Sequence, residues 1–233
     1  MANFVVLHLE KAKGADAKMS AHIERTFIAA NVDESRIHLD RELIAFPESV
    51  KSRSAAIEHR IKNANLKRKV GKNQVHAIRV MLSASPEAME RIEQEGRLDN
   101  WCEQSVEWMQ ETFGKENLVS AVLHLDEKTP HIHATIVPIV TATRRKKKSE
   151  ENVKKHYRKK AEGARLCADD LMTQAKLKNY QTSYANAMQP FGLERGIDGS
   201  EARHISTREY YTEQYRKAEN LKEDISLLAE QKE

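Results

Sequence analysis

The segment HLDEKTPHIH, residues 124–133, places three histidines, two carboxylates and a proline within ten residues. Alternate side chains of an extended strand point to the same face, so His131 and His133 share a face, with Cα atoms about 7 Å apart. His124 belongs to a preceding apolar strand that the same segment would join to the next one as a hairpin. If the apolar residues of both strands cover one core, all three histidines converge on the opposite face.

Three imidazole nitrogens on neighbouring strands can reach one divalent ion at about 2.0–2.2 Å. Zinc, iron, manganese and copper all accept imidazole, so the residues do not choose among them. An ion with three neutral ligands keeps its charge and open positions, and would polarise an anionic oxygen such as that of a phosphodiester. Asp126 or Glu127 could accept a hydrogen bond from a ligating imidazole and so fix the tautomer of that ligand. The alternative is a polar strand face, the ordinary interpretation of any single histidine.

The distribution of charge favours a polyanionic partner such as nucleic acid. The net charge of the 233 residues is only +4. Residues 51–72 carry eight Lys and Arg against one Glu, and residues 144–160 carry ten against two, which leaves a net charge of −11 for the rest of the chain. Two solvated helix faces are the alternative explanation of these basic stretches.

Cysteines and apolar runs exclude other classes of protein. Cys102 and Cys167 are far apart and form no CxxC pair, so neither a zinc ribbon nor a disulfide framework is indicated. The apolar run FVVL near the start is too short for a signal peptide core or a membrane span. We therefore expect a protein of the reducing cytoplasm, without a membrane span.

Strands are indicated by runs rich in β-branched residues, and helices by apolar residues three and four apart. Pro86 directly after Ser85 marks the start of a helix, in which Gly96 marks a break. The predicted strands cover residues 3–11, 75–85, 117–127 and 131–140. The predicted helices cover residues 14–33, 50–70, 86–114 and about 165–190.

The helix predicted for residues 14–33 has one apolar stripe with His22 at its border. The stripe consists of Met19, Ile23, Phe27 and Ala30. Arg25 lies one turn from His22, and its positive charge would lower the pKa of the imidazole below its ordinary value of about 6.5. From the residues alone, His22 is most simply a packing residue at a helix surface.

The hairpin segment, with VP shortly after it, resembles the signature of the Pre/Mob (MobV-type) plasmid mobilisation relaxases of the HUH superfamily. The segments SAHIERTF, SRIHLDREL and GLERGIDGSEARHISTREYY resemble further blocks of this family, in its order, so the resemblance covers about residues 1–211. It implies an α+β fold in which a central antiparallel β-sheet carries the three-histidine hairpin and is flanked by α-helices. It also implies a site- and strand-specific enzyme that nicks an origin of transfer, holds the 5′ end covalently and rejoins the strand.

Carried over by position, the resemblance implies a role for each residue of the site. The metal ligands would be His124, His131 and His133, with Mn²⁺ or Mg²⁺ as the usual ion. Glu127 matches an acidic residue that assists catalysis. From the residues themselves, Asp126 and Arg25 are expected to support the ligands. The nucleophile of the family falls on His22, which would form a labile phosphoramidate and leave religation accessible without ATP.

The resemblance also implies a DNA partner, single-stranded around the nick and duplex beside it. Arg36 and Arg41 in the block SRIHLDREL could hold phosphates, whereas the duty of His38 there is not evident. A basic arm, residues 141–163, lengthens the chain after the second hairpin strand and is expected to follow the DNA backbone. Its cluster of candidate phosphate contacts is Arg144, Arg145, Lys146, Lys147 and Lys148.

Other functions remain as alternatives. Many other relaxases use a tyrosine nucleophile, and Tyr180 and Tyr184 lie four apart on a predicted helix, after the hairpin. A DNA-binding module could recognise the origin without cutting it, around a structural metal, although closed structural zinc sites usually have four ligands. A hydrolase of small phosphodiesters would need no basic arms. The ordered family blocks and both basic stretches favour the relaxase.

The sequence predicts two regions. Residues 1–206 would form the nicking domain, and residues 207–233 the start of a C-terminal helical region. Apolar residues in the second region follow an incomplete heptad pattern, at Tyr211, Ala218 and Ile225, with Leu221 and Leu228 offset by three. The resemblance implies that this region serves dimerisation or the recruitment of a partner such as a coupling protein.

Overall fold

The computed structural model describes residues 3–14, 16–71, 73–141 and 163–197, together with Arg216. The chain divides into two compact units, residues 1–196 and 197–233, and the first contains the histidine hairpin. Most of the basic arm and of the predicted C-terminal helical region lies outside the described residues. The boundary expected at residue 206 stays a prediction.

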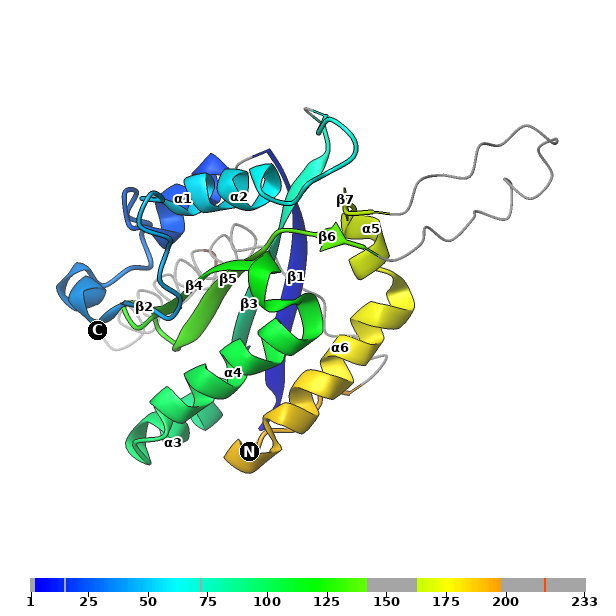
Figure 1. The fold of residues 1–233 in the computed structure, drawn as a ribbon. Coiled ribbons are helices and arrows are strands. Elements are labelled where there is room, and N and C mark those ends of the chain that lie inside the picture. The colour runs from blue at the N-terminus through cyan, green and yellow to red at the C-terminus, as the bar shows by residue number, and fades with distance from the viewer. Residues whose placement is uncertain (1–2, 15, 72, 142–162, 198–215, 217–233) are drawn as a thin grey trace, which may run out of the picture. The chain divides into compact units, whose positions relative to one another are not determined.

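A five-stranded antiparallel sheet forms the centre of the first unit (Figure 1). Its strands run in the order β1-β3-β5-β4-β2, so the two strands of the histidine hairpin, β4 and β5, pair directly inside the sheet. Their bounds are Val5–Lys13 for β1, Arg41–Glu42 for β2, Val75–Ala84 for β3, Leu118–His124 for β4 and His131–Ile136 for β5. The predicted fold class, α+β with a central antiparallel sheet, is confirmed.

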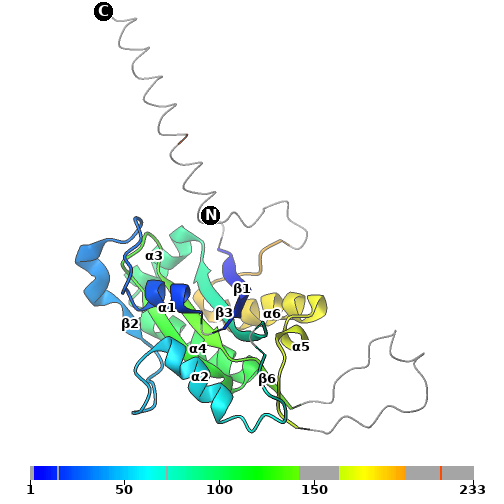
Figure 2. The same cartoon turned by 90° about the horizontal axis from the view of Figure 1, so that it is seen from above.

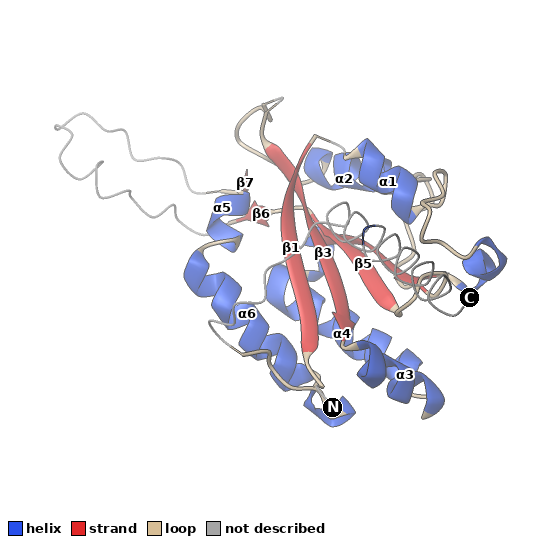
Figure 3. Cartoon of the chain, turned by 180° about the vertical axis from the view of Figure 1, so that it is seen from behind, coloured by secondary structure: helices blue, strands red, loops and turns tan. Residues whose placement is uncertain are grey.

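Helices cover both faces of this sheet (Figures 1 and 3). Seen from above, α1 and α2 lie together on one side of the strands (Figure 2). The helices on that side are α1 (Ala17–Ile23) and α2 (Arg53–Lys62), and those on the other are α3 (Pro86–Gln94), α4 (Leu98–Phe113) and α6 (Gln174–Ala187). The helix start at Pro86 and the break at Gly96 are therefore confirmed.

Shorter elements complete the first unit. The β6–β7 pair joins the two ends of the arm, and the 3-10 helix η1 lies between α1 and β2. Their bounds are Glu34–Leu39 for η1, Lys115–Asn117 for η2, Ile139–Val140 for β6, Arg165–Leu166 for β7, Ala168–Leu171 for α5 and Gln189–Phe191 for η4.

The main core fills the space between the sheet and the helices α3, α4 and α6. Every second residue of β5 points into it, and Ile132, Ala134 and Ile136 are all buried. The large side chains that meet them include Trp101 and Tyr184. Because side chains alternate along a strand, the histidines of β5 must point to the other face, toward α1 and α2.

The prediction of one helix over residues 14–33 is wrong. The helix α1 ends at Ile23, and Arg25 adopts a left-handed conformation with φ of 51° that an L-residue helix cannot continue. The predicted apolar stripe ends there as well, since Phe27 is 63% exposed and Ala30 is also exposed. A hydrogen bond from the Phe27 amide to the Ala21 carbonyl closes the turn.

Both hairpin strands and two helices are also shorter than predicted. The strand expected for residues 117–127 ends at His124, so the acidic residues that follow belong to the connecting turn. The strand expected to reach residue 140 ends at Ile136, shortly before Pro138, which has no amide hydrogen to donate. The basic helix expected over residues 50–70 covers Arg53–Lys62, and residues 165–190 begin with a strand rather than a helix. Within the described part of the chain, none of the helices is long and apolar enough to cross a bilayer.

Candidate metal and catalytic site

The pairing of β4 with β5 brings the three hairpin histidines together. His124 lies opposite His131, and Val122 lies opposite His133. The ring centroids are 5.3 Å apart for His124 and His131, 5.0 Å for His124 and His133, and 4.8 Å for His131 and His133. The convergence expected from strand alternation is therefore present.

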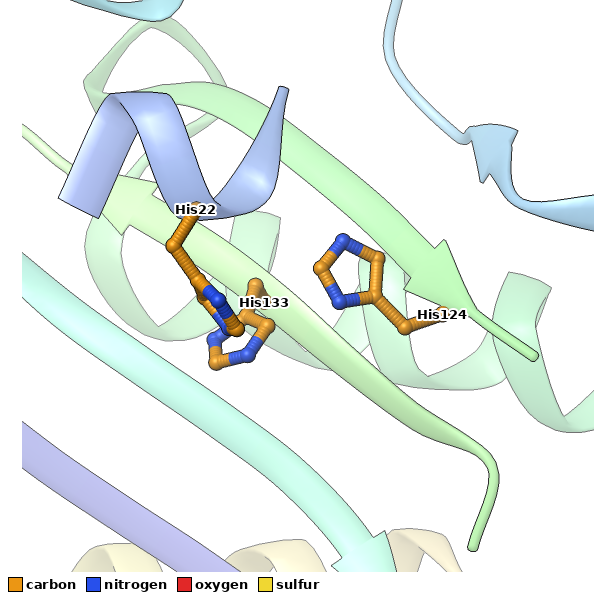
Figure 4. A group of neighbouring side chains, drawn as sticks. All are labelled: His22, His124 and His133. Carbon is orange, nitrogen blue, oxygen red and sulfur yellow. The ribbon is translucent and has the colours of Figure 1, made fainter. Parts of the chain in front are cut away.

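A fourth histidine approaches the group from the helix above it. His22 lies in the last turn of α1, and its ring points toward the sheet (Figure 4). Its centroid is 5.3 Å from that of His133 and 5.8 Å from that of His124. Thus the candidate nucleophile and the candidate ligands, more than 100 residues apart in sequence, face each other.

Arg25 ties the end of α1 to the hairpin turn. Its side chain is only 7% exposed, and its guanidinium donates two hydrogen bonds to Asp126, of 2.7 and 2.5 Å, and one of 3.1 Å to Glu127. It also lies 2.8 Å from Nδ1 of His124. Since a guanidinium can only donate, Nδ1 accepts this hydrogen bond, and Nε2 lies 3.3 Å from the Ile23 carbonyl. Binding of a metal ion through His124 would replace one of these two contacts.

Glu127 lies at the centre of the histidine group. Its Oε1 is 3.8 Å from Nε2 of His22, 3.9 Å from Nδ1 of His124 and 4.0 Å from Nε2 of His131. Its other oxygen accepts a hydrogen bond of 2.6 Å from the side-chain amide of Asn31. One carboxylate oxygen is therefore held by Asn31, and the other faces the imidazoles.

The loop between α1 and β2 supplies two residues that the sequence analysis missed, Asn31 and Asp40. A carboxylate oxygen of Asp40 accepts the amide of Leu125 at 2.7 Å, and the amide of Asp33 donates to the Asp126 carbonyl at 2.7 Å. No spacing in the sequence indicates these contacts, because they join positions about 90 residues apart. The sequence block SRIHLDREL contains Asp40 and resembles a family block, so it indicated that this region matters, but it did not single out Asp40.

Burial favours the neutral form of His22, His124 and His133. It is the largest cause of the lowered pKa of His22, and the charge of Arg25 acts in the same direction against the opposing effect of Glu127. The direction expected from Arg25 is therefore present, although desolvation is the larger cause. Burial also lowers the pKa of His124 to about 3 and that of His133 well below its usual range. Neutral imidazoles are the form that binds a metal ion.

The donor atoms present fit a divalent cation. The Nδ1 of His131 lies 2.9 Å from the Thr129 carbonyl, and donating to it would leave the Nε2 lone pair facing the group. Among the described residues, three sets have ligand atoms within 4.8 Å of one another, and each contains His124. They are His22–His124–His133, His124–Glu127–His131 and Asp40–His124–Asp126. The first set means that His22 is itself close enough to serve as a ligand.

The predicted DNA contacts lie outside this group. Arg36 is exposed on η1, and so is His38. Arg41 is also exposed, but its guanidinium binds Asp99 at 2.5 Å. The five predicted contacts from Arg144 to Lys148 lie outside the described residues.

The comparison with protein families decides which kind of protein carries this site. The Mob_Pre model, described as plasmid recombination enzyme, matches residues 1–212. The chain belongs to the Mob/Pre family. A 65 kDa protein of Zymomonas mobilis is 30% identical over 214 residues, which cover 91% of this chain and 33% of that protein. The plasmid recombination enzyme of Bacillus thuringiensis is 26% identical over 225 residues, 92% of this chain and 44% of that enzyme. The chain thus spans a third to a half of the length of these relatives.

Solved structures show the fold of this Mob/Pre chain. The Mn-bound crystal structure of the MobM relaxase domain with pMV158 oriT DNA matches with a TM-score of 0.72 and 24% identity, covering 90% of this chain and 98% of that domain. A structure of the same domain with a 26-nucleotide oriT DNA matches with a TM-score of 0.64 and 21% identity, covering 89% and 99%. The first unit therefore has the relaxase-domain fold expected from the family resemblance.

We expect the metal-free protein to lose stability between about pH 7.5 and pH 5.5. His124 takes up a proton near pH 6.5 when unfolded but not in the folded protein, so unfolding binds a proton in this range, and stability falls as the pH falls. His124 alone should lower the free energy of unfolding by about 1.4 kcal/mol. Urea unfolding with a chelator present measures this, and His124→Asn should show a weaker pH dependence. A free energy that stays constant or rises on acidification would contradict neutral buried histidines.

Proposed function

We propose that this member of the Mob/Pre family is a metal-dependent relaxase that nicks one strand at an origin of transfer and later rejoins it. This activity would start the mobilisation of a plasmid or mobile element. The observation that carries the proposal is the approach of His22 from α1 to the hairpin histidines, with Glu127 Oε1 3.8 Å from its Nε2. The relatives named plasmid recombination enzyme, and the MobM relaxase domain bound to oriT DNA, support it.

His124, His131 and His133 would hold the ion, and Mn²⁺ is favoured because the MobM structures are Mn-bound. When bound, it would polarise an oxygen of the scissile phosphodiester. Arg25 would hold Glu127 and Asp126 in place around the histidines through the hydrogen bonds described above. Asn31 would fix the second oxygen of Glu127.

His22 would attack the phosphorus as a neutral imidazole. A nitrogen–phosphorus bond forms while the bond from phosphorus to the 3′ oxygen breaks, so the 5′ phosphate stays on the protein. The attacking ring carries a surplus proton, and Glu127 is the nearest carboxylate to His22 that can accept it and pass it to the leaving 3′ oxygen. Attack of the 3′-hydroxyl on the phosphoramidate reverses these steps and rejoins the strand.

The partner in this proposal is origin DNA, single-stranded at the nick and duplex beside it. Exposed Arg36 and the basic arm would contact its phosphates. The enzyme would act in the cytoplasm, where such DNA is found. Residues 207–233 would provide a contact for dimerisation or for a coupling protein.

Tyrosine nucleophiles are disfavoured by the packing of α6 against α4. Tyr184 is fully buried, its hydroxyl lies 3.1 Å from that of Ser105, and its ring centroid is 4.9 Å from that of Trp108. Tyr180 is 5% exposed, and burial raises the pKa of both hydroxyls. Both belong to the core on the face of the sheet opposite the histidines. The four other tyrosines, Tyr157, Tyr210, Tyr211 and Tyr215, lie outside the described residues.

The decisive experiment incubates a labelled single strand from the element's own origin with Mn²⁺ and wild-type or His22→Ala protein. We expect a covalent adduct on a denaturing gel that brief acid treatment destroys and that is absent for His22→Ala. An acid-stable adduct that survives the substitution would indicate a tyrosine nucleophile. DNA binding without any adduct would favour the non-cleaving module, and turnover of a small chromogenic diester alone would favour a simple hydrolase.

Mn²⁺ binding separates the two roles that the geometry allows His22. We expect His131→Ala to lose most of its Mn²⁺ affinity, by at least about tenfold, and His22→Ala to bind Mn²⁺ as the wild type does. Isothermal titration of the metal-free proteins measures both. If His22→Ala loses as much affinity as His131→Ala, then His22 is a ligand rather than the nucleophile.

Tyr184→Phe tests the tyrosine alternative directly. It removes the hydroxyl that meets Ser105, so we expect the free energy of unfolding to fall by about 0.5–1.5 kcal/mol. Adduct formation should stay within about twofold of the wild-type rate under folding conditions. Loss of the adduct in a protein that remains folded by circular dichroism would overturn the assignment to His22.

We propose that Phe27 stacks on a base beside the nick. The residue is 63% exposed and lies two residues after Arg25, on the loop that borders the site. Aromatic stacking on an unpaired base contributes about 1–3 kcal/mol, so Phe27→Ala should weaken binding of uncleavable single-stranded origin DNA by about tenfold. Phe27→Trp should retain the affinity in fluorescence anisotropy. Equal affinity of wild type and Phe27→Ala would show that this side chain contacts no base.

A further inference from the structure

Arg53, the first residue of α2, is fully buried between α1, α2 and the sheet. Its Nε donates to the Thr135 hydroxyl at 2.6 Å, its Nη1 to the Ser20 hydroxyl at 3.0 Å, and its Nη2 to the Asp16 carboxylate at 2.9 Å. Its backbone amide donates to Glu24 at 2.6 Å. A buried arginine with this many partners is held in one geometry, and it can hold those partners in turn.

Three of these contacts follow one face of α1. Asp16, Ser20 and Glu24 are spaced four residues apart, so their side chains stand one above another along the helix. They run from the residue before the first turn to the residue after the last. Arg53 therefore contacts the whole length of the short helix that carries His22.

Asp16 fastens the beginning of α1 to the sheet as well. It precedes the helix in a left-handed conformation, with φ of 57°, and its carboxylate caps none of the helix amides. Instead it receives two hydrogen bonds from Arg79 on β3, of 2.8 and 2.5 Å, besides that from Arg53. Although burial opposes ionisation, these arginines hold the pKa of Asp16 below its ordinary value.

Thr135 connects the same arginine to the strand of the candidate metal ligands. It is buried on β5, two residues after His133 and on the same face of the sheet. Two hydrogen bonds thus lead from β5 through Arg53 to Ser20, and Ser20 lies two residues before His22. This path joins the strand that would hold the ion to the helix that would supply the nucleophile.

Few apolar contacts fix α1 otherwise. The helix has seven residues, and of these only Ser20 and Ile23 are buried. We propose that Arg53 is a positioning residue, which clamps α1 to β5 and sets the distance between the His22 ring and the hairpin histidines. This inference rests on the proposed function and gives a reason for a buried charge outside the catalytic group.

Thr135→Val tests the clamp, because valine has the shape of threonine but accepts no hydrogen bond from Arg53. We expect the single-turnover rate of adduct formation at saturating DNA to fall by at least about tenfold, since small misplacements of a nucleophile are costly. The affinities for Mn²⁺ and for uncleavable origin DNA should stay within about twofold of the wild-type values. Thr135→Ser keeps the hydroxyl and should restore most of the rate.

Ser20→Ala is the second variant, because it removes a different acceptor of Arg53 on α1 itself. It decides the question if Thr135→Val does not fold. Arg60→Lys serves as the matched control on α2, since Arg60 binds Asn117 and Glu116 instead of α1. The control should change the adduct rate by less than about twofold. All rates are measured well below the melting temperature of the least stable variant.

The outcomes separate this inference from the proposed function. If the wild type forms no adduct, the proposed function fails and the inference with it. If the wild type forms the adduct and folded Thr135→Val or Ser20→Ala forms it at the wild-type rate, the inference alone is wrong. A parallel loss of Mn²⁺ affinity, DNA affinity and rate would also overturn it, because that pattern indicates general damage to the domain. A rate defect alone, restored by Thr135→Ser, supports the clamp.

Discussion

The ion pairs between Arg25 and the carboxylates of Asp126 and Glu127 are the interaction on which the site depends. They join the loop after α1 to the turn between β4 and β5, about 100 residues away in sequence. All three side chains are at least 85% buried, so leaving one without its partner would cost several kcal/mol. Arg25 adopts a left-handed backbone conformation where the helix ends, and this conformation lets its guanidinium turn back toward the hairpin.

The two faces of the sheet have different kinds of interior. On the side of α3, α4 and α6, strand residues such as Ile132 and Ile136 pack into an apolar core. On the side of α1, the same strand presents His131, His133 and Thr135, which meet charged and polar groups. The apolar core packed on one face can hold the strand backbone in a fixed position, and this backbone then positions the polar side chains on the other face. The hairpin strands lie inside the sheet, and His133 has a paired residue on each side, Met81 on β3 and Val122 on β4, so its backbone is firmly held.

The sequence predicted the parts of this structure that local rules control. Alternation along β5, the proline that starts α3 and the glycine before α4 are decided by neighbouring residues, and all three were correct. The helix over residues 14–33 failed because Arg25 takes its conformation from carboxylates 101 and 102 residues away. The roles of Asn31 and Arg53 could not be predicted from the sequence for the same reason. Both depend on side-chain partners that only the folded chain brings close, and neither residue belongs to a spacing that indicates chemistry.

The burial that suits the histidines to their proposed chemistry also explains the arginines around them. A nucleophilic or metal-binding imidazole must be neutral, and removal from water favours the neutral form of His22 and His124. An unpaired charge in the same buried surroundings would strongly destabilise the fold, so the charged groups there are paired with groups of opposite charge. Asp126 and Glu127 are paired with Arg25 at the C-terminal end of α1, and Asp16 with Arg53 and Arg79 at its N-terminal end. Directional hydrogen bonds at both ends fix a short helix more narrowly than a few apolar contacts can, because a small shift of α1 would break several at once. The polar network is thus a consequence of keeping His22 neutral and a means of keeping it in place.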